Sequence, residues 1–402
     1  MKCLKYYVFI LSILMFTLVT ISFDTFKKTK QEPAIAVMAY YVAGENFDPS
    51  KLPLDKLTHI IFSFTKIIDN EMKFQNNATA DKLRLLVQQR DKYPNLKIMV
   101  ACGGWGADGF SDMANSVESR QKFVLSIVEF NREFNIDGLD IDWEYPTIPA
   151  AQTNARPEDK KNFTLLMKGL REALNTLNRK QTLTFASAGW KQYYKNIELK
   201  EVIKYVDYMN IMTYDQIGSN SPFTGHHTPL GWIKEKDMVG TPAEVLLESR
   251  KAEMKEGGKE YEPGSVESIV EYCIKAGVPS TKIVVGAAFY GRAWKGVSSP
   301  NNGLYQANSG SYLGWSSYSQ IREEYENNSN YKRFWDSVAK APFLYSKKDE
   351  VFMTYDDTVS VKLKVDFAKE RRLGGIMFWQ LGLDTKEKNS LLNAIFKEAN
   401  AK

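Results

Sequence analysis

The chain has 402 residues, of which 44% are hydrophobic and 25% are charged, an ordinary composition for a globular protein. The formal net charge of +5 comes mostly from the first 30 residues, where five lysines outweigh the single acid Asp24. Taking that +4 from +5 leaves about +1 for the rest of the chain, so the charge gives no reason to expect a nucleic acid as a partner.

The N-terminus has the layout of an export signal. Lys2 and Lys5 precede an apolar run of 18 residues, and a polar stretch then continues to residue 33. A cleaved signal peptide has this pattern, and a run of that length can also span a bilayer as an uncleaved anchor. We therefore assign residues 1–33 as a leader plus tether. We expect the protein to be exported (secreted, periplasmic or surface-anchored), with membrane contact only through this segment if it is uncleaved.

Short apolar, β-branched runs recur through the rest of the chain, as in strands that are covered on both faces. Helix-like amphipathic segments lie between several of them, and strand followed by helix about eight times predicts a (β/α)₈ TIM barrel. The predicted strands are 35–42, 58–64, 97–102, 137–143, 182–188, 208–213, 282–289 and 375–380. The predicted helices are 82–92, 116–134, 158–177, 265–276 and 359–371.

The spacing between the seventh and eighth predicted strands is too long for a plain strand–helix unit. It is rich in Gly, Asn, Ser and aromatic residues, and it ends in further strand-like runs. We assign 293–345 as a small α+β insertion domain, and 34–292 with 346–402 as the barrel. In barrel enzymes, insertions in the loops between strands and helices commonly carry the residues that determine substrate specificity.

The fourth predicted strand carries three acids on one parity, Asp140, Asp142 and Glu144, with apolar Leu139 and Ile141 on the other. Successive side chains of a strand point to opposite faces, so the three carboxyl groups should form one row. Burying them is costly, and core packing has no use for them. Because Glu144 ends the strand, where barrels place catalytic groups, this row is the candidate active site.

The acid row has two alternative interpretations that need no acid catalysis. Backbone donors could satisfy a purely structural ladder of acids, and carboxylates are also ligands of Mg²⁺ or Mn²⁺. We favour catalysis, because closely spaced like charges push their pKa values apart and can keep one acid protonated near neutral pH. No metal and no cofactor is expected.

Other features of the sequence are weaker signals. The run from Gly104 to Gly109 matches a dinucleotide fingerprint, but bulky Trp105 occupies its turn, and a sugar-contacting loop is the better interpretation. His226 and His227 are adjacent on a predicted loop, and neighbouring residues rarely bind one ion. For Cys102 and Cys273 we expect buried free thiols, with a disulfide as the alternative.

The stretch 137–146, with its three spaced acids followed by Tyr145 and Pro146, resembles the signature of glycoside hydrolase family 18, the chitinases and their relatives. The resemblance extends over nearly the whole chain after residue 35. The runs Met212-Thr213-Tyr214-Asp215, Ala288-Phe289-Tyr290-Gly291-Arg292 and Gly374-Gly375-Ile376-Met377-Phe378-Trp379 resemble the family's sixth-, seventh- and eighth-strand motifs.

The resemblance implies retaining hydrolysis of β-1,4 bonds between N-acetylglucosamine units, in which the substrate's acetamido oxygen is the nucleophile and forms an oxazolinium ion. Glu144 is then the proton donor, Asp142 orients the acetamido group and Asp140 sets the charge of Asp142. Tyr214 and Asp215 hold the acetamido group from the other side. The substrate-binding residues implied are Trp379, Arg292, Trp105, Tyr145, Tyr290 and Met212.

The sequence departs from the family at Ala101, where the third-strand motif usually has a serine. This removes a hydroxyl near the acid row and puts the pH optimum in question. Alternatives to a chitinase are an endo-β-N-acetylglucosaminidase acting on N-glycan cores and a non-catalytic, chitin-binding lectin-like relative. The expected partner is an N-acetylglucosamine-containing saccharide, and the expected state is a monomer.

Overall fold

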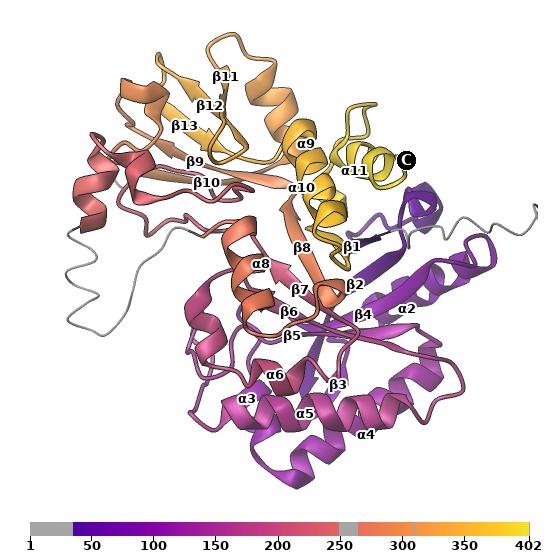
Figure 1. Cartoon of the computed structure of the whole chain (residues 1–402). Coiled ribbons are helices and arrows are strands. Elements are labelled where there is room, and N and C mark those ends of the chain that lie inside the picture. The colour runs from indigo at the N-terminus through magenta and orange to yellow at the C-terminus, as the bar shows by residue number, and fades with distance from the viewer. Residues whose placement is uncertain (1–34, 249–263, 309–310, 402) are drawn as a thin grey trace, which may run out of the picture. The chain divides into compact units, whose positions relative to one another are not determined.

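The computed structural model describes residues 35–248, 264–308 and 311–401, so the leader predicted at 1–33 lies outside the described residues. Within those ranges, eight parallel strands close into a barrel because β1 pairs with both β14 and β2 (Figure 1). The barrel strands are β1 (Ala36–Val42), β2 (His59–Ile68), β4 (Lys97–Gly103), β5 (Gly138–Asp142), β6 (Thr182–Ala188), β7 (Tyr208–Met212), β8 (Ile283–Ala288) and β14 (Gly375–Trp379). Each overlaps one predicted strand, and the predicted (β/α)₈ fold is confirmed.

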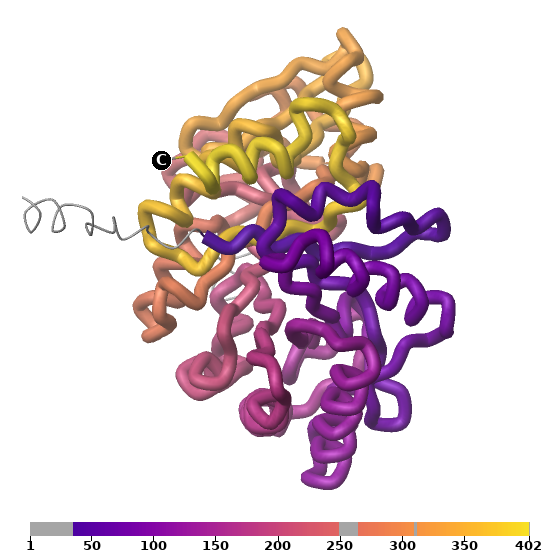
Figure 2. Tube along the Cα trace, turned by 90° about the vertical axis from the view of Figure 1, so that its right-hand side faces the viewer, coloured from indigo at the N-terminus to yellow at the C-terminus, as the bar shows by residue number. Residues whose placement is uncertain are grey.

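Helices surround the barrel and bury one apolar face each. In α4 the side chains of Phe123, Ile127, Phe130 and Phe134 recur at helical spacing and are buried, and Ser116 caps the N-terminus by accepting a hydrogen bond from Ser119 N. The helices are α2 (Asn77–Val87), α3 (Phe110–Asn115), α4 (Val117–Phe134), α5 (Asp159–Leu174), α6 (Leu199–Val202), α8 (Val266–Lys275), α10 (Thr358–Glu370) and α11 (Leu391–Ala399). The C-terminal helix α11 lies near β1, where the two ends of the barrel sheet meet (Figure 2).

Two apolar layers follow from the alternation of the barrel strands. Side chains of one parity, such as Leu139 and Ile141, pack outward against the helices and are fully buried. Side chains of the other parity fill the barrel, among them Met38, Ala101 and Met377. The carboxyl group of Asp140 has the inward parity of its strand, and a carboxyl group in such a place has to find hydrogen-bond donors.

A second, antiparallel sheet follows β8, with the strand order β10-β9-β13-β12-β11. Its strands are β9 (Tyr290–Lys295), β10 (Ser311–Ser317), β11 (Lys332–Asp336), β12 (Ala341–Ser346) and β13 (Val351–Thr354), with the short helix α9 (Tyr318–Gln320) after β10. The sheet therefore begins before and ends after the predicted range 293–345. The reason is that β9 follows β8 almost without a break, and β13 returns to pair with it. A further short strand, β3 (Glu71–Lys73), pairs antiparallel with the end of β2.

Two other features of the described chain bear on the sequence predictions. Cys102 and Cys273 are buried free thiols, as expected. No helix in the residues that the structure covers is long and apolar enough to cross a membrane.

A buried ion pair ties the second sheet to the barrel. Lys364 of α10 and Asp356, just after β13, are both inaccessible to solvent, with 2.6 Å between Lys364 Nζ and Asp356 Oδ2. The same carboxylate oxygen accepts hydrogen bonds from the amide of Ala288, at the end of β8, and from the hydroxyl of Thr228, in the loop after β7. One pair thus connects four segments around the barrel rim.

Replacing Lys364 with Met should lower the free energy of unfolding by about 3–5 kcal/mol, because Asp356 would be left as an uncompensated buried charge. Urea denaturation measures this change. Lys362→Met is the matched control, since Lys362 is exposed on the same helix, and its effect should stay within about 0.5 kcal/mol. Equal effects of the two substitutions would contradict a stabilising role for the pair.

Candidate active site

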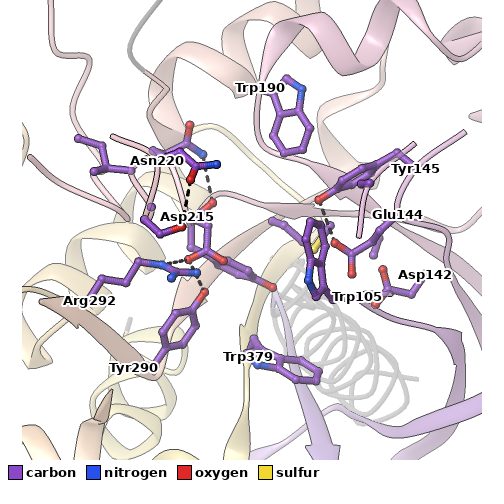
Figure 3. A pocket seen from close by; sticks show the side chains of 18 of the residues that line it. Trp105, Asp142, Glu144, Tyr145, Trp190, Asp215, Asn220, Tyr290, Arg292 and Trp379 are labelled. Carbon is purple, nitrogen blue, oxygen red and sulfur yellow. Dashed lines mark hydrogen bonds and ion pairs between the residues drawn. The ribbon is translucent and has the colours of Figure 1, made fainter. Parts of the chain in front are cut away.

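A cavity of about 880 Å³ opens at the carboxyl ends of the barrel strands. Every site residue predicted from the sequence lines it except Asp140, which is fully buried behind Asp142. The predicted residues in the lining are Trp105, Asp142, Glu144, Tyr145, Met212, Tyr214, Asp215, Tyr290, Arg292 and Trp379. Figure 3 shows Trp379 between two groups, with Glu144, Asp142 and Trp105 on one side and Asp215, Arg292 and Tyr290 on the other.

The backbone around the acid row is unusually close-packed. Gly103, at the end of β4, has φ of +124°, and a Cβ there would lie 2.0 Å from the carbonyl oxygen of Asp142. Only glycine fits such a position. On the opposite face of the row, the Trp143 ring stacks on Phe110 at 5.3 Å between ring centroids. Trp143 is therefore a packing residue, and the acids are fixed from both sides.

Asp140 is held by three donors from three other barrel strands, β1, β6 and β7. Tyr40 Oη donates to its Oδ2 at 3.0 Å, while the Thr184 hydroxyl and the Asn210 amide donate to its Oδ1. Burial raises the pKa of Asp140 to about 6, and these hydrogen bonds oppose the rise. Ala101 is directly opposite Asp140 in the β4–β5 register and supplies no hydroxyl. Thr184 holds the equivalent register position on the other neighbouring strand, β6, and does supply one.

Asp142 is the least satisfied carboxyl group of the row. Burial raises its pKa well above the ordinary value, the charges of Glu144 and Asp140 raise it further, and Lys66 opposes them. In the described part of the chain, no protein group hydrogen-bonds to Asp142 Oδ1, although this atom is buried. A buried acceptor without a donor carries a desolvation cost. Asp142, which also lines the cavity, thus keeps an acceptor that no group of the described chain pairs.

Glu144 has the properties of a general acid. Burial raises its pKa to about 7, against a hydrogen bond from Tyr145 that lowers it, while Asp215 raises it and Lys66 lowers it. Tyr145 Oη donates to Glu144 Oε2 at 2.9 Å. A carboxyl group with a pKa near the operating pH can both donate a proton and take one back.

Asp215, across the cavity, is held in its ionised form. Burial alone would raise its pKa, but His227 and Arg292 overcome that effect and keep the pKa below its ordinary value. Arg292 Nε and Tyr290 Oη donate to Asp215 Oδ1 at 2.6 and 2.8 Å, and His227 Nδ1 lies 3.6 Å from the same oxygen. The neighbouring His226 faces away, with its Nε2 3.1 Å from Asp336.

Aromatic rings form the floor and one end of the cavity. Trp379 stacks on Phe64 with 5.5 Å between centroids and 20° between planes. Trp105 also lines the cavity and is 66% exposed. Trp190, which the sequence did not place, packs edge-on against Tyr145 at 5.0 Å. Flat apolar faces of this kind suit the apolar face of a sugar ring.

Sequence reasoning missed the residues that tune the acid row from other strands. Lys66 acts electrostatically on both Asp142 and Glu144, and its Nζ donates to the carbonyl of Gly103 at 2.9 Å. The predicted second strand ended at residue 64, whereas β2 continues to Ile68. The available signal was that Lys66 lies two residues after Phe64, so that both side chains would point to the same face if the strand continued. Nothing in the sequence alone pairs Thr184, Asn210 or Tyr40 with Asp140, because the barrel register decides that contact.

Comparison with known proteins agrees with this geometry. The sequence model of glycosyl hydrolases family 18 matches residues 36–384. The chain belongs to this family. It is 36% identical to Chitinase A1 of Niallia circulans over 317 residues, covering 76% of the chain and 43% of that protein, and 32% identical to Chitinase B of Serratia marcescens, covering 89% and 78%.

Solved structures give the same result. A family 18 N-acetylglucosaminidase from Paenibacillus barengoltzii superposes with a TM-score of 0.77 at 34% identity, over 90% of this chain and 99% of that one. Chitinase ChiA74 from Bacillus thuringiensis gives a TM-score of 0.80 at 27% identity, over 92% and 71%. The chain spans less than half the length of Chitinase A1. The protein is thus a glycoside hydrolase. The described residues form the closed barrel, and the cavity lies at the carboxyl ends of its strands.

Replacing Tyr145 with Phe should move the alkaline limb of the pH–rate profile to higher pH. The acid must be protonated to work, so the wild-type kcat/KM should fall as the pH rises through the Glu144 pKa of about 7. The lost hydrogen bond had stabilised the ionised form of Glu144, and the pKa of the variant is therefore higher. Profiles of kcat/KM against pH measure this. Tyr205→Phe, away from the cavity, is the control, and an unchanged limb in Tyr145→Phe would contradict the assignment of Glu144.

Proposed function

We propose that the protein hydrolyses β-1,4 bonds between N-acetylglucosamine units, with retention of configuration and with the substrate's own acetamido group as nucleophile. The observation that carries the proposal is the environment of Asp142. Its Oδ1 is buried beside the cavity, lacks a hydrogen-bond donor within the described chain and lies next to an acid with a raised pKa. An acetamido N–H is a donor that fits this place.

Proton transfer is the first step. Glu144, protonated near neutral pH, gives its proton to the glycosidic oxygen and so makes the leaving sugar a neutral alcohol. After that sugar departs, the ionised Glu144 takes a proton from an incoming water. Tyr145 supports this second role, because its hydroxyl stabilises the ionised carboxylate.

The choice of nucleophile follows from the positions of the carboxyl groups. An ordinary retaining glycosidase has its nucleophile on the far side of the reacting carbon. Among the described residues that line the cavity, the carboxyl groups belong to Asp142, Glu144 and Asp215. The first two come from the same strand end, and Asp215 is engaged by Arg292 and Tyr290. The acetamido oxygen is then the remaining nucleophile, and its attack gives an oxazolinium ion.

Asp142 stabilises that intermediate by accepting the acetamido N–H, while Asp140 behind it sets the number of protons that the acid row holds. Tyr214 and Asp215 position the acetamido group from the other side, and Trp379 supports the reacting sugar ring from below. Each role matches the chemistry of the residue: a carboxylate acceptor, a phenol donor and a flat apolar face. These roles extend the family assignment to individual residues.

The substrate class is proposed as chitin or its oligosaccharides. Relatives such as those from Niallia circulans and Serratia marcescens are named chitinases, and the similar structure from Paenibacillus barengoltzii is named an N-acetylglucosaminidase. The second sheet favours a long linear substrate rather than a branched N-glycan core, because Tyr290 and Arg292 of β9 extend the cavity lining beyond the barrel. We further propose that the leader at 1–33 directs export and that the protein acts as a monomer.

Glu144→Gln should lower kcat on chitotetraose by at least about 100-fold, the usual scale of general acid catalysis. The amide keeps the shape of the side chain but cannot donate the proton, so the dissociation constant for the tetramer, measured by calorimetry, should stay within a few-fold of the wild-type value. Glu129→Gln, an exposed position on α4, is the control and should keep full turnover. Near-normal turnover in Glu144→Gln would refute the proposed acid.

A further inference from the structure

Lys66 is a half-buried lysine near the end of β2, next to the cavity but not part of its lining. Its ammonium nitrogen donates a hydrogen bond to the carbonyl oxygen of Gly103 at 2.9 Å. The same nitrogen lies 5.6 Å from the centroid of the Phe64 ring, and Phe64 does line the cavity. Lys66 can therefore influence a bound sugar only through other side chains.

A shift in the strand register decides which way this lysine points. Phe62 of β2 packs outward against the helices, and strict alternation would turn Phe64 and Lys66 outward as well. Between Ser63 and Thr65, however, β2 advances two residues while β4 advances one. Such a bulge redirects the side chains that follow it. After it, Phe64 packs against the inner cluster of the barrel, and Lys66 follows on the same side.

The carbonyl that holds the ammonium group belongs to the strand beside the acid row. Gly103 is opposite Asp142 in the β4–β5 register, and a Cβ on Gly103 would lie 2.0 Å from the carbonyl oxygen of Asp142. The backbone amide of Gly104 donates to that same oxygen at 2.9 Å. A charge anchored on Gly103 is thus fixed with respect to the end of β5, whereas an unanchored lysine side chain samples many positions.

The neutral groups around the acid row cannot offset its negative charge. Burial raises the pKa of the Cys102 thiol to about 12, so this group is uncharged at neutral pH. Burial likewise raises the pKa of each tyrosine phenol that acts on the row. These phenols belong to Tyr40, Tyr145, Tyr193 and Tyr214.

The other cations on neighbouring elements are engaged by acids of their own. In the described residues, the pairs are Arg292 with Asp215 across the cavity (Figure 3), and Lys73 of β3 and Lys122 of α4 with Glu71. Lys66 acts on both Asp142 and Glu144, and in each case it favours the ionised form. It is therefore the cation that opposes the mutual repulsion of these carboxyl groups.

We propose that Lys66 is a positioning residue for hydrolysis: its ammonium group, fixed on the carbonyl of Gly103, keeps negative charge on the acid row. The inference rests on the proposed function, in which Asp142 accepts the acetamido N–H and then faces a positively charged intermediate. A carboxylate does both better than a carboxylic acid, and a fixed cation nearby favours the carboxylate. Lys66 acts through these carboxyl groups and does not touch the substrate.

The test is the profile of kcat/KM against pH on chitotetraose. Lys66→Met keeps the length of the side chain but removes its charge, so the ionised forms of the acid row lose a stabilising interaction. Both limbs of the profile should then move to higher pH, by about one unit, because the interacting carboxyl groups titrate together. Lys66→Arg restores a positive charge and should return both limbs close to their wild-type positions. Limb positions do not depend on the fraction of enzyme that is folded.

Lys73→Met is the matched control, because it removes a positive charge at the position opposite Lys66 in the β2–β3 register. Its limbs should stay in place, since Lys73 is exposed and paired with Glu71. Unmoved limbs in Lys66→Met, a uniform loss of rate at every pH, limbs that stay shifted in Lys66→Arg, or an equal shift in the control would overturn the role of Lys66. A wild-type protein that does not hydrolyse chitotetraose would instead refute the proposed function, together with the inference that rests on it.

Discussion

Folding buries three carboxyl groups at the end of one strand, and the rest of the site depends on how their desolvation is compensated. Burial is the largest cause of the raised pKa at Asp140, Asp142 and Glu144 alike. The three acids differ in the hydrogen bonds that offset this desolvation. Asp140 accepts from three donors and Glu144 accepts from Tyr145, whereas Asp142 Oδ1 has no donor in the described structure. The outcome is that the middle carboxyl group of the row, Asp142, is the one left with an unpaired acceptor in the described structure.

The barrel supplies this arrangement through register and close approach. Strand β4 can pass next to the acid row only because Gly103 has no Cβ, and the side chain opposite Asp140 on that strand is the small Ala101. Ala101 has no hydroxyl, and the hydroxyl that Asp140 does receive from an adjacent strand comes from Thr184 of β6. On the other side of the cavity, the second sheet contributes Tyr290 and Arg292, and a buried ion pair fastens that sheet to the rim. Tyr290 and Arg292 of the cavity lining thus come from the second sheet, whereas Trp379 and the acid row come from the barrel.

The fold is largely predictable because its signals are local. Apolar strands alternating with amphipathic helices predict the barrel, and the parity of residues 139–144 predicts that the acids lie on the opposite side of their strand from Leu139 and Ile141. Contacts between strands are a different matter. Lys66, Thr184 and Asn210 look like ordinary strand residues, and only the register brings them to the acid row. The second sheet also extends beyond the predicted insertion 293–345 for a related reason, since β13 joins it only by pairing with β9.

The central claim is that the nucleophile belongs to the substrate, and one measurement tests it most directly. Chitooligosaccharide substrates can be prepared with none, one, two or three fluorine atoms on the acetyl methyl of the reacting sugar. Fluorine withdraws electron density from the acetamido oxygen, so kcat/KM should fall steeply with each added atom if that oxygen attacks the anomeric carbon. Rates that stay level across the series would contradict the account and point to a protein carboxylate, with Asp215 as the remaining candidate in the described cavity.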